Sequence, residues 1–420
     1  MTVKILPCNL NGTVTAPPSK SAGHRSLICA ALANGVSTIS NCGVSDDINA
    51  TASVLEALGA KITRNGLTVT VSPAKRNNKN IELFCNESGS TARFILPIAA
   101  ALGVENAVIT GAGRLPQRPF QVICDALRQN GVNCSSNTLP ITVSGKLKAG
   151  EFVLPGDISS QYISGLLLAL SIVQGESKIT LTTPLQSAAY VDMTVNELTA
   201  FGADITKVKD GYKISGKKTL TSKTRTIEGD WSQAAFFLVS GAVSGSITVK
   251  GLNDASLQGD KEIINLLKRF GADISIHGDE IKVRRSELIG IDIDASQIPD
   301  LVPILAVAAT FAKGKTTITG AERLRIKESD RLKETVMRLN AFGIRATETD
   351  DGMVIEGGKP CSSTISSAGD HRIVMAFSVM ASAANGETII EGAEAINKSY
   401  PEFFNDFNLL GGKSNVICDR

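Results

Sequence analysis

Hydrophobic and polar positions along the chain repeat in one order about every 70 residues. A stretch that is apolar nearly all round comes first, as in 160–175, and a short β-rich run such as SKITL follows it. A loop, a more polar amphipathic stretch, a glycine and two further strand-like runs complete each copy. This order predicts a βαβαββ unit whose first helix is buried and whose second helix is half exposed.

A glycine ends the amphipathic stretch of every copy, as in LEALGAKIT and LKRFGADIS. Glycine after the last helical residue is a common stop signal, because it adopts the left-handed conformation without strain. The spacings between these glycines are 72, 71, 69, 72 and 68 residues, so six copies account for all 420 residues. We therefore predict an α/β fold of six βαβαββ repeats, in which sheets cover buried parallel helices. The glycines are Gly59, Gly131, Gly202, Gly271, Gly343 and Gly411.

The starts of the six apolar stretches lie 70 residues apart and carry polar side chains. Ser and Asp are ordinary N-cap residues, so a structural role explains any one of these positions taken alone. The first three starts, however, hold donors or small residues, while the last three hold carboxylates. Parallel helices would also direct several positive dipole ends toward one region, which favours an anionic ligand. These positions are Lys20, Ser90, Ser160, Asp230, Asp300 and Asp370.

Basic residues lie where such an anion would bind. Arg25 and Arg93 follow one turn into the first two apolar stretches, and Arg118 and Lys398 lie in equivalent loops. The run RLRIKESDR is the densest in charge, and the other repeats mostly lack it. A solvated helix face would explain the run by itself. Its restriction to one repeat instead favours a functional site.

Composition narrows the function class. The formal net charge is only +2 and aromatic residues make up 5%, which opposes a nucleic-acid-binding surface. Three histidines and eight cysteines without a CxxC pair offer few ligands for zinc and indicate reduced thiols. The start lacks a signal-peptide pattern, and the apolar runs are well short of the ~20 residues that span a bilayer. We expect a cytoplasmic protein without a metal, a cofactor or a membrane partner.

Eight motifs in order resemble the 5-enolpyruvylshikimate-3-phosphate (EPSP) synthase family of enolpyruvyl transferases across the whole chain. They are PPSKSAGHRSL, ESGSTARF, QRPF, SSQY, IPDLVP, RIKESDRL, DHR and NKSYP. The resemblance implies transfer of the enolpyruvyl group of phosphoenolpyruvate to the 5-hydroxyl of shikimate 3-phosphate, with release of phosphate. It also implies a monomer, inhibition by glyphosate, and a two-domain inverse α/β fold. The domains would be 17–228, and 1–16 together with 229–420, with the active site in the cleft between them.

The resemblance also implies the residues that contact the substrates. Two phosphates and a carboxylate need several fixed cations, and arginine suits them because it bonds in bidentate fashion. Catalysis needs a base for the hydroxyl and an acid for the vinyl carbon, for which Asp300, Glu328 and Lys20 are the candidates. The implied shikimate 3-phosphate contacts are Ser21, Arg25, Ser159, Ser160, Gln161, Ser187, Asp300 and Lys327. The implied phosphoenolpyruvate contacts are Lys20, Gly89, Arg118, Gln161, Arg331, Arg372 and Lys398.

Two positions depart from the family pattern, and two other functions remain as alternatives. Glu87 and Arg323 stand where the family often has asparagine or a similar residue. The sister family that acts on UDP-N-acetylglucosamine usually has a reactive cysteine at the position of Gly113 and an asparagine at that of Ser21, so both positions point away from it. The other alternative is a non-catalytic repeat scaffold that binds anions.

Overall fold

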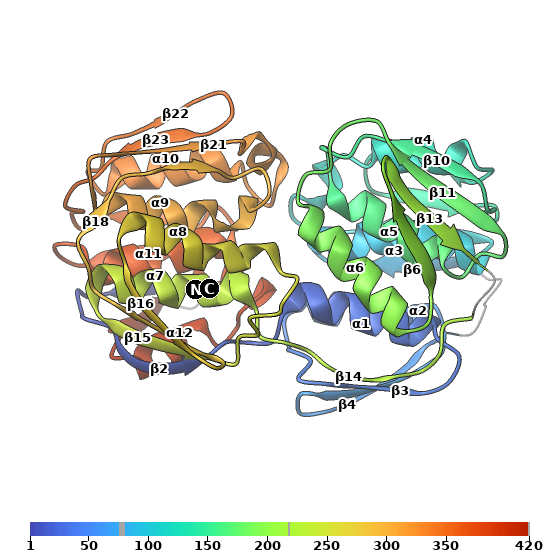
Figure 1. Ribbon diagram of the computed structural model, residues 1–420, viewed down its shortest axis with the longest axis horizontal. Coiled ribbons are helices and arrows are strands. Elements are labelled where there is room, and N and C mark those ends of the chain that lie inside the picture. Colours follow the sequence, from blue (N-terminus) through green and yellow to red (C-terminus); the bar gives the residue numbers. More distant parts are fainter. Residues whose placement is uncertain (75–79, 217–218, 419–420) are drawn as a thin grey trace. The chain divides into compact units, whose positions relative to one another are not determined.

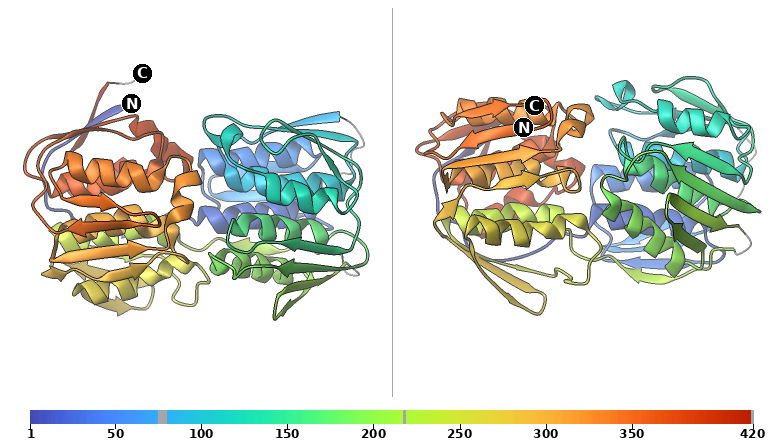
Figure 2. Two further views of the ribbon diagram at one scale, coloured as in Figure 1. Left: turned by 90° about the horizontal axis from the view of Figure 1, so that it is seen from above. Right: turned by 45° about the horizontal axis from the view of Figure 1, so that its top comes forward.

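A computed structural model describes residues 1–74, 80–216 and 219–418. The chain forms two compact units. Pro18–Ile227 form one, here called the central unit, and Met1–Pro17 with Glu228–Arg420 form the other, the terminal unit. The predicted domain 17–228 extends one residue beyond the central unit at each end. Figures 1 and 2 show the buried helices of each unit with strands arranged around them.

The central unit contains three of the repeats. Its helices are α1 (Lys20–Leu32), α2 (Asp46–Ala57), α3 (Gly89–Leu102), α4 (Gln121–Arg128), α5 (Ser160–Leu170) and α6 (Ala188–Ala200), with the 3₁₀ helix η1 (Leu115–Gln117). Its strands are β3 (Ser37–Ser40), β4 (Lys61–Asn65), β5 (Thr68–Ser72), β6 (Asn80–Phe84), β7 (Asn106–Thr110), β8 (Asn133–Cys134), β9 (Ile141–Ser144), β10 (Glu151–Leu154), β11 (Glu176–Leu181), β12 (Asp204–Val208), β13 (Gly211–Ser215) and β14 (Thr224–Thr226).

The terminal unit contains the other three repeats. Its helices are α7 (Trp231–Ser244), α8 (Ile263–Phe270), α9 (Val302–Thr310), α10 (Arg331–Ala341), α11 (His371–Ser382) and α12 (Phe403–Leu409), with the 3₁₀ helices η2 (Gly259–Glu262), η3 (Pro299–Leu301), η4 (Glu322–Ile326) and η5 (Ala393–Lys398). Its strands are β1 (Thr2–Ile5), β2 (Asn11–Thr15), β15 (Ser246–Lys250), β16 (Asp273–His277), β17 (Glu280–Arg284), β18 (Leu288–Ile289), β19 (Asp292–Asp294), β20 (Ala312–Lys313), β21 (Lys315–Thr319), β22 (Ala346–Glu348), β23 (Met353–Glu356), β24 (Thr364–Ser366), β25 (Thr388–Glu391) and β26 (Ser414–Cys418).

Each repeat contributes to a four-stranded sheet with one parallel and two antiparallel pairings. In the order β6-β7-β9-β8, for example, Asn80 of β6 lies opposite Asn106 of the parallel strand β7, and Asn106 lies opposite Ser144 of the antiparallel strand β9. Distant segments complete three of the sheets: β1 pairs with β25 and β26, β2 with β15, and β14 with β3. The βαβαββ prediction is confirmed.

The first helix of each repeat is buried, as its apolar pattern predicts. All residues of α7, α9 and α11 are buried, and these three helices pack on one another in the terminal unit. In the central unit α3 packs on α5, while α1 contacts α2 and α6. Within the described ranges, no helix is long and apolar enough to cross a membrane. Because neighbouring elements cover the sides of a buried helix, a ligand can approach only its ends. The N-terminal end is the one that favours an anion.

All six predicted stop glycines have left-handed backbone angles, with φ between 80° and 97°. Five of the six helix starts were predicted to within one residue. Lys20 and Ser160 are the first residues of α1 and α5, α3 begins one residue before Ser90, and Asp230 and Asp370 are the N-caps of α7 and α11. The expectation that Asp300 begins the fifth buried helix is wrong, because Asp300 lies inside η3 and α9 starts at Val302.

Candidate active site

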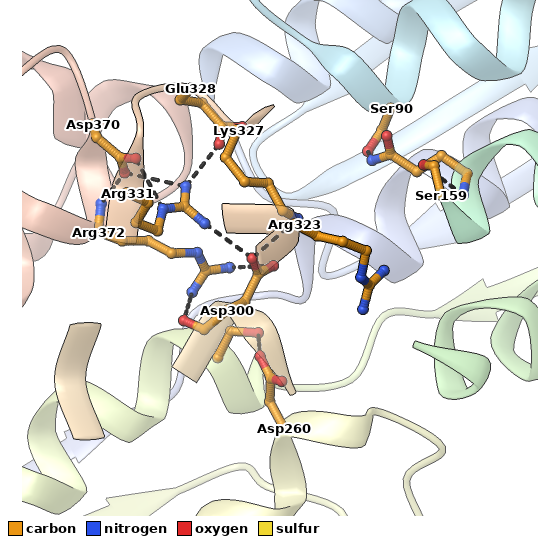
Figure 3. A network of polar contacts seen from close by, with 12 residues as sticks. Ser90, Ser159, Asp260, Asp300, Arg323, Lys327, Glu328, Arg331, Asp370 and Arg372 are labelled. Atoms are coloured by element: carbon orange, nitrogen blue, oxygen red, sulfur yellow. Dashed lines mark hydrogen bonds and ion pairs between the residues drawn. The ribbon is translucent and has the colours of Figure 1, made fainter. Parts of the chain in front are cut away.

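Asp300 of the terminal unit lies among three cations from three other segments (Figure 3). Its Oδ1 accepts a hydrogen bond from Arg331 Nη1 at 3.0 Å and lies 3.5 Å from Lys327 Nζ. Its Oδ2 accepts from Arg372 Nη2 at 2.9 Å, and its main-chain oxygen lies 3.2 Å from Arg372 Nη1. Lys327 directly follows η4, Arg331 begins α10 and Arg372 lies in the first turn of α11. The starts of two helices and the end of a 3₁₀ turn therefore meet at one carboxylate.

Two further carboxylates hold Arg331 in place. Its Nε donates to Asp370 Oδ2 at 2.9 Å, and its Nη2 donates to Glu328 Oε2 at 2.7 Å. Asp370 also caps α11 by accepting from the main-chain nitrogen of Arg372 at 2.9 Å. Arg331 is only 1% exposed, so its guanidinium has little freedom to move. The sequence marked Asp370 only as a helix start, although it positions both arginines.

The charges of this group determine its ionisation. Burial by itself raises the pKa of Asp300, but Arg372, Lys327 and Arg331 outweigh burial and hold that pKa well below its usual range. Burial likewise lowers the pKa of Arg331, but Asp370, Glu328 and Asp300 raise it above its usual value. Asp300 is therefore ionised and Arg331 is protonated at neutral pH.

A predicted substrate contact of the terminal unit, Lys398, and one departure from the family pattern, Arg323, both lie in 3₁₀ helices. Lys398 is the last residue of η5 and is 5% exposed. Arg323 lies in η4, and its Nη2 donates to the main-chain oxygen of Ser296 at 2.6 Å. Arg323, the departure from the family pattern, is thus fixed to the loop that precedes η3.

In the central unit, α1 carries three of the predicted residues. Lys20 begins the helix, and its Nζ lies 2.7 Å from Asp47 Oδ2 at the start of α2. Arg25, one turn later, donates from Nη1 to the main-chain oxygen of Ser21 at 2.7 Å. Nothing in the sequence pattern marked Asp47 as the partner of Lys20, because the pairing joins two separate helices.

Contacts from α6 fix the guanidinium of Arg25. Its Nε donates to Thr194 Oγ1 at 2.7 Å, and its Nη2 donates to the main-chain oxygen of Tyr190 at 2.8 Å. Burial lowers the pKa of Arg25 to about 10, which leaves it protonated at neutral pH. Ser187 occupies the N-cap position of α6 with φ 52° and is buried.

The starts of α3 and α5 bring two more arginines together. A Cβ atom on Gly89 would lie 2.6 Å from Arg118 Nη1 and 3.2 Å from Arg93 Nη1, so both guanidiniums lie against this glycine. Arg93 Nη1 donates to Gln161 Oε1 at 2.5 Å, and Gln161 Nε2 donates to Ser90 Oγ at 2.8 Å. The predicted set omitted Arg93, although its position one turn into an apolar helix had marked it as a candidate.

The first turn of α5 carries two further predicted residues. Ser159 caps this helix, because its Oγ accepts from the main-chain nitrogen of Gln161 at 3.3 Å. Ser160 is the first residue of the helix and is buried. The turn therefore sets small hydroxyl side chains beside the amide of Gln161, an arrangement that can donate to an anion.

Glu87 lies against the loop before Arg118. A Cβ atom on Gly113 would be 1.7 Å from Glu87 Oε1, and Gly113 has φ 56°. A side chain at position 113 would therefore need both a strained backbone and displacement of Glu87. The cysteine expected at this position in the sister family would meet the same strain and the same neighbour.

Comparison with known proteins agrees with these motifs. A family model described as EPSP synthase (3-phosphoshikimate 1-carboxyvinyltransferase) matches residues 6–407. The chain belongs to the EPSP synthase family. A 3-phosphoshikimate 1-carboxyvinyltransferase from Clostridium kluyveri is 43% identical, over 98% of this chain and 97% of its own length. One from Methanococcus maripaludis is 39% identical, over 97% of this chain and 98% of its own.

Two solved structures share the fold of this chain. EPSP synthase from Acinetobacter baumannii superposes with a TM-score of 0.82 at 29% identity, covering 99% of this chain and all of that one. The enolpyruvyl transferase NikO from Streptomyces tendae superposes with a TM-score of 0.81 at 19% identity, which shows a common fold alone. The α/β fold predicted from the repeats, and the inverse α/β arrangement implied by the resemblance, are therefore those of EPSP synthases.

Proposed function

We propose that this chain transfers the enolpyruvyl group of phosphoenolpyruvate to the 5-hydroxyl of shikimate 3-phosphate and releases phosphate. The observation that carries the proposal is the Asp300 carboxylate, which three cations contact at 2.9 to 3.5 Å in a member of this family. A carboxylate fixed among cations suits a reaction that binds phosphorylated anions and removes a proton from a hydroxyl.

Each substrate would take contacts from both units. Shikimate 3-phosphate would contact α1, α5 and α6 of the central unit, and Asp300 and Lys327 of the terminal unit. Phosphoenolpyruvate would contact Lys20 and the Gly89–Arg118 group, together with cations of the terminal unit. The contacts proposed for shikimate 3-phosphate are Ser21, Arg25, Ser159, Ser160, Gln161, Ser187, Asp300 and Lys327. Those for phosphoenolpyruvate are Lys20, Gly89, Arg118, Gln161, Arg331, Arg372 and Lys398.

The same cations that bind an anion would control the strength of Asp300 as a base. While Arg372, Lys327 and Arg331 all contact it, the pKa of Asp300 is lowered and the carboxylate is a weak base. A bound phosphate or carboxylate draws these cations to itself, which raises the pKa of Asp300 toward its usual range. Asp300 would then accept the proton of the acceptor hydroxyl only when substrate is bound.

The reaction also requires proton transfer to the methylene carbon, followed by loss of phosphate. The Lys20 ammonium, or Glu328 once it has taken up a proton, would give a proton to the methylene carbon of phosphoenolpyruvate as the hydroxyl oxygen forms a bond to C2. Loss of phosphate from C2 and of one proton from the new methyl group then restores the double bond. Glu328→Gln should lower kcat by about 10²-fold, the usual scale for a lost acid–base group, and should slow entry of solvent deuterium into the methylene group. Unchanged deuterium entry would remove Glu328 from this role.

A phosphate-release assay tests the function directly. Purified protein with shikimate 3-phosphate and phosphoenolpyruvate should release phosphate, while replacement of shikimate 3-phosphate by UDP-N-acetylglucosamine should give no release. Release with the nucleotide sugar would assign the chain to the sister reaction, which the contact of Glu87 with Gly113 opposes. No release with either acceptor, despite anion binding, would favour a non-catalytic scaffold.

We also propose that the enzyme is a cytoplasmic monomer that needs no cofactor or metal. Activity should therefore elute from gel filtration at the size of one 44.1 kDa chain and should survive treatment with a chelator. Activity confined to larger particles, or restored only by added metal, would contradict these expectations.

A further inference from the structure

A buried carboxyl group outside the predicted site lies close behind Asp300. Asp260 belongs to η2 and is 1% exposed. Its Oδ2 accepts a short hydrogen bond from Ser232 Oγ in the first turn of α7, whereas its Oδ1 has no hydrogen-bond partner among the described residues. Figure 3 shows Asp260 on the opposite side of Asp300 from Glu328. A buried oxygen without a donor is costly when the carboxyl group is ionised.

The contacts of the Asp300 group join equal numbers of cations and carboxylates without Asp260. Three cations, Lys327, Arg331 and Arg372, contact three carboxylates at distances of 3.5 Å or less. An ionised Asp260 would therefore be an additional negative charge in a buried region. The three carboxylates are Asp300, Glu328 and Asp370.

The polar groups that act on Asp260 come from three segments: η3, the start of α7 and the start of α11. Burial has the largest effect and raises its pKa, and the carboxylates of Asp300 and Asp230 raise it further. Arg372 and the hydroxyl of Ser232 act in the opposite direction, and the result is a pKa of about 7. Asp260 therefore changes its charge in the neutral pH range, next to an arginine and a carboxylate of the proposed site.

We propose that Asp260 is a positioning residue that acts through Arg372 and sets the affinity of the site for phosphoenolpyruvate. Neutral Asp260 leaves Arg372 with Asp300, from which an anionic substrate can draw it. Ionised Asp260 attracts Arg372 to itself and repels the substrate, so both effects weaken binding. The inference rests on the proposed function for its ligand, but the protonation of Asp260 can be measured without any ligand.

Infrared difference spectroscopy of the ligand-free protein tests the protonation step. A protonated-carboxyl band should be present at about pH 6 and should disappear with a midpoint near pH 7, and Asp260→Asn should lack it. Asparagine imitates the neutral carboxyl and still offers Ser232 an acceptor. Asp406→Asn is the matched control, because Asp406 also accepts from a hydroxyl, that of Tyr400 at 2.5 Å, and should leave the midpoint unchanged. A band unaffected by Asp260→Asn would overturn the inference.

The only tryptophan of the chain provides a second signal. Trp231 directly precedes Ser232 in α7 and is buried, so its fluorescence should change with the same midpoint in the wild type. Ser232→Ala removes a hydrogen bond that favours the ionised form and should move the midpoint to higher pH. This variant keeps the inference testable if Asp260→Asn fails to fold. An unchanged midpoint in Ser232→Ala would count against the contact.

The pH dependence of the KM for phosphoenolpyruvate then separates positioning from a structural role. At saturating shikimate 3-phosphate, the wild-type KM should rise above pH 7, by at most about tenfold per pH unit for one linked proton. Asp260→Asn should keep the low-pH KM up to about pH 8.5, because it has no proton to lose at this position. A variant whose KM rises as in the wild type would overturn the inference, whereas the absence of all turnover would refute the proposed function instead.

Discussion

Asp300→Ala removes the carboxylate on which three cations meet. Arg331 keeps its contacts with Asp370 and Glu328, whereas Arg372 and Lys327 lose the contacts at 2.9 and 3.5 Å. Among the charged side chains joined by these contacts, three cations then remain with only two carboxylates. The variant therefore loses the proposed base while the site becomes more favourable to anions.

In Asp300→Ala, kcat should fall while the KM for phosphoenolpyruvate should not rise. Loss of a positioned base should lower kcat by about 10²-fold or more. The KM for phosphoenolpyruvate should stay the same or fall, because two charges about 4 Å apart interact with an energy of about 4 kcal/mol at an effective dielectric constant near 20, and Asp300 no longer competes. Loss of a substrate contact alone would instead raise KM and leave kcat nearly intact.

Stability should fall as well, and an anion should restore it. Breaking a fully buried ion pair destabilises a protein by about 3–5 kcal/mol. Asp300 is 18% exposed, so we expect roughly 2–4 kcal/mol, more than the about 1 kcal/mol of a lost helix cap. Inorganic phosphate should occupy the place of the missing carboxylate, and 100-fold excess over its Kd restores about 2.7 kcal/mol. The free energy of unfolding, measured with and without phosphate, gives both quantities.

The lowered pKa of Asp300 determines how the loss of unfolding free energy in Asp300→Ala depends on pH. A carboxyl whose pKa is lower in the folded state stabilises the fold above its unfolded pKa of about 3.9, and this stabilisation is lost as pH falls through the folded value. The difference between the wild type and Asp300→Ala should therefore stay constant from about pH 6 to about pH 9, as far as Asp300 alone is concerned.

A helix-cap variant in the same unit is the matched control. Asp330 caps α10 by accepting from the main-chain nitrogen of Lys333 at 3.1 Å. Asp330→Ala should lose about 1 kcal/mol of stability and little activity. If Asp300→Ala behaved in the same way, with lower stability but near-native kcat, Asp300 would have only a structural role and the proposed mechanism would be refuted.

Three further predictions concern other parts of the chain. Gly89→Ala places a methyl group 2.6 Å from Arg118 Nη1. In steady-state assays it should raise the inhibition constant of glyphosate more than the KM for phosphoenolpyruvate, because the longer inhibitor needs more room. Equal increases would mean that the methyl group excludes both ligands alike. Asp260, whose pKa is raised to about 7, stabilises the fold at low pH, so the unfolding free energy of the wild type should fall by about 4 kcal/mol between about pH 4 and pH 7 from this group. Asp260→Asn has no proton to lose at this position and should not show this fall. Alkylation of the native protein should modify Cys361, which is exposed, and leave turnover intact; rapid inactivation that substrate prevents would contradict this.

The repeat could be predicted from sequence because local rules determine its boundaries. Gly59 and the five equivalent glycines all adopt the left-handed angle that a helix stop requires, whatever surrounds them. The start of the fifth buried helix was predicted wrongly because Pro299 and Pro303 flank Asp300. Proline favours the first helical positions, and here a 3₁₀ turn led by Pro299 precedes α9 and takes Asp300 inside it.

Partners across the fold could not be predicted in this way. Lys20 and Asp47 lie 27 residues apart on two helices, and Arg331 and Asp370 lie 39 residues apart. Neither spacing corresponds to a period of helix or strand. The first contact depends on how the two helices of one repeat pack, and the second on how two repeats pack. The cations of these ion pairs could be recognised from their sequence motifs. Asp47, Asp260 and the positioning role of Asp370 could be recognised only in the structure.

The contacts of the cations suggest how the site selects its ligands. Lys20, Arg331 and Arg372 each contact a carboxylate of the protein, so an anion must replace such contacts rather than occupy an unused charge. A single negative charge gains little from that exchange, since it takes over only one of several contacts. A ligand with a phosphate dianion and a carboxylate would replace several contacts at once, and in the proposed mechanism its binding would restore the basicity of Asp300. The ion pairs would thus favour multiply charged substrates and restrict proton removal from the hydroxyl to the occupied site.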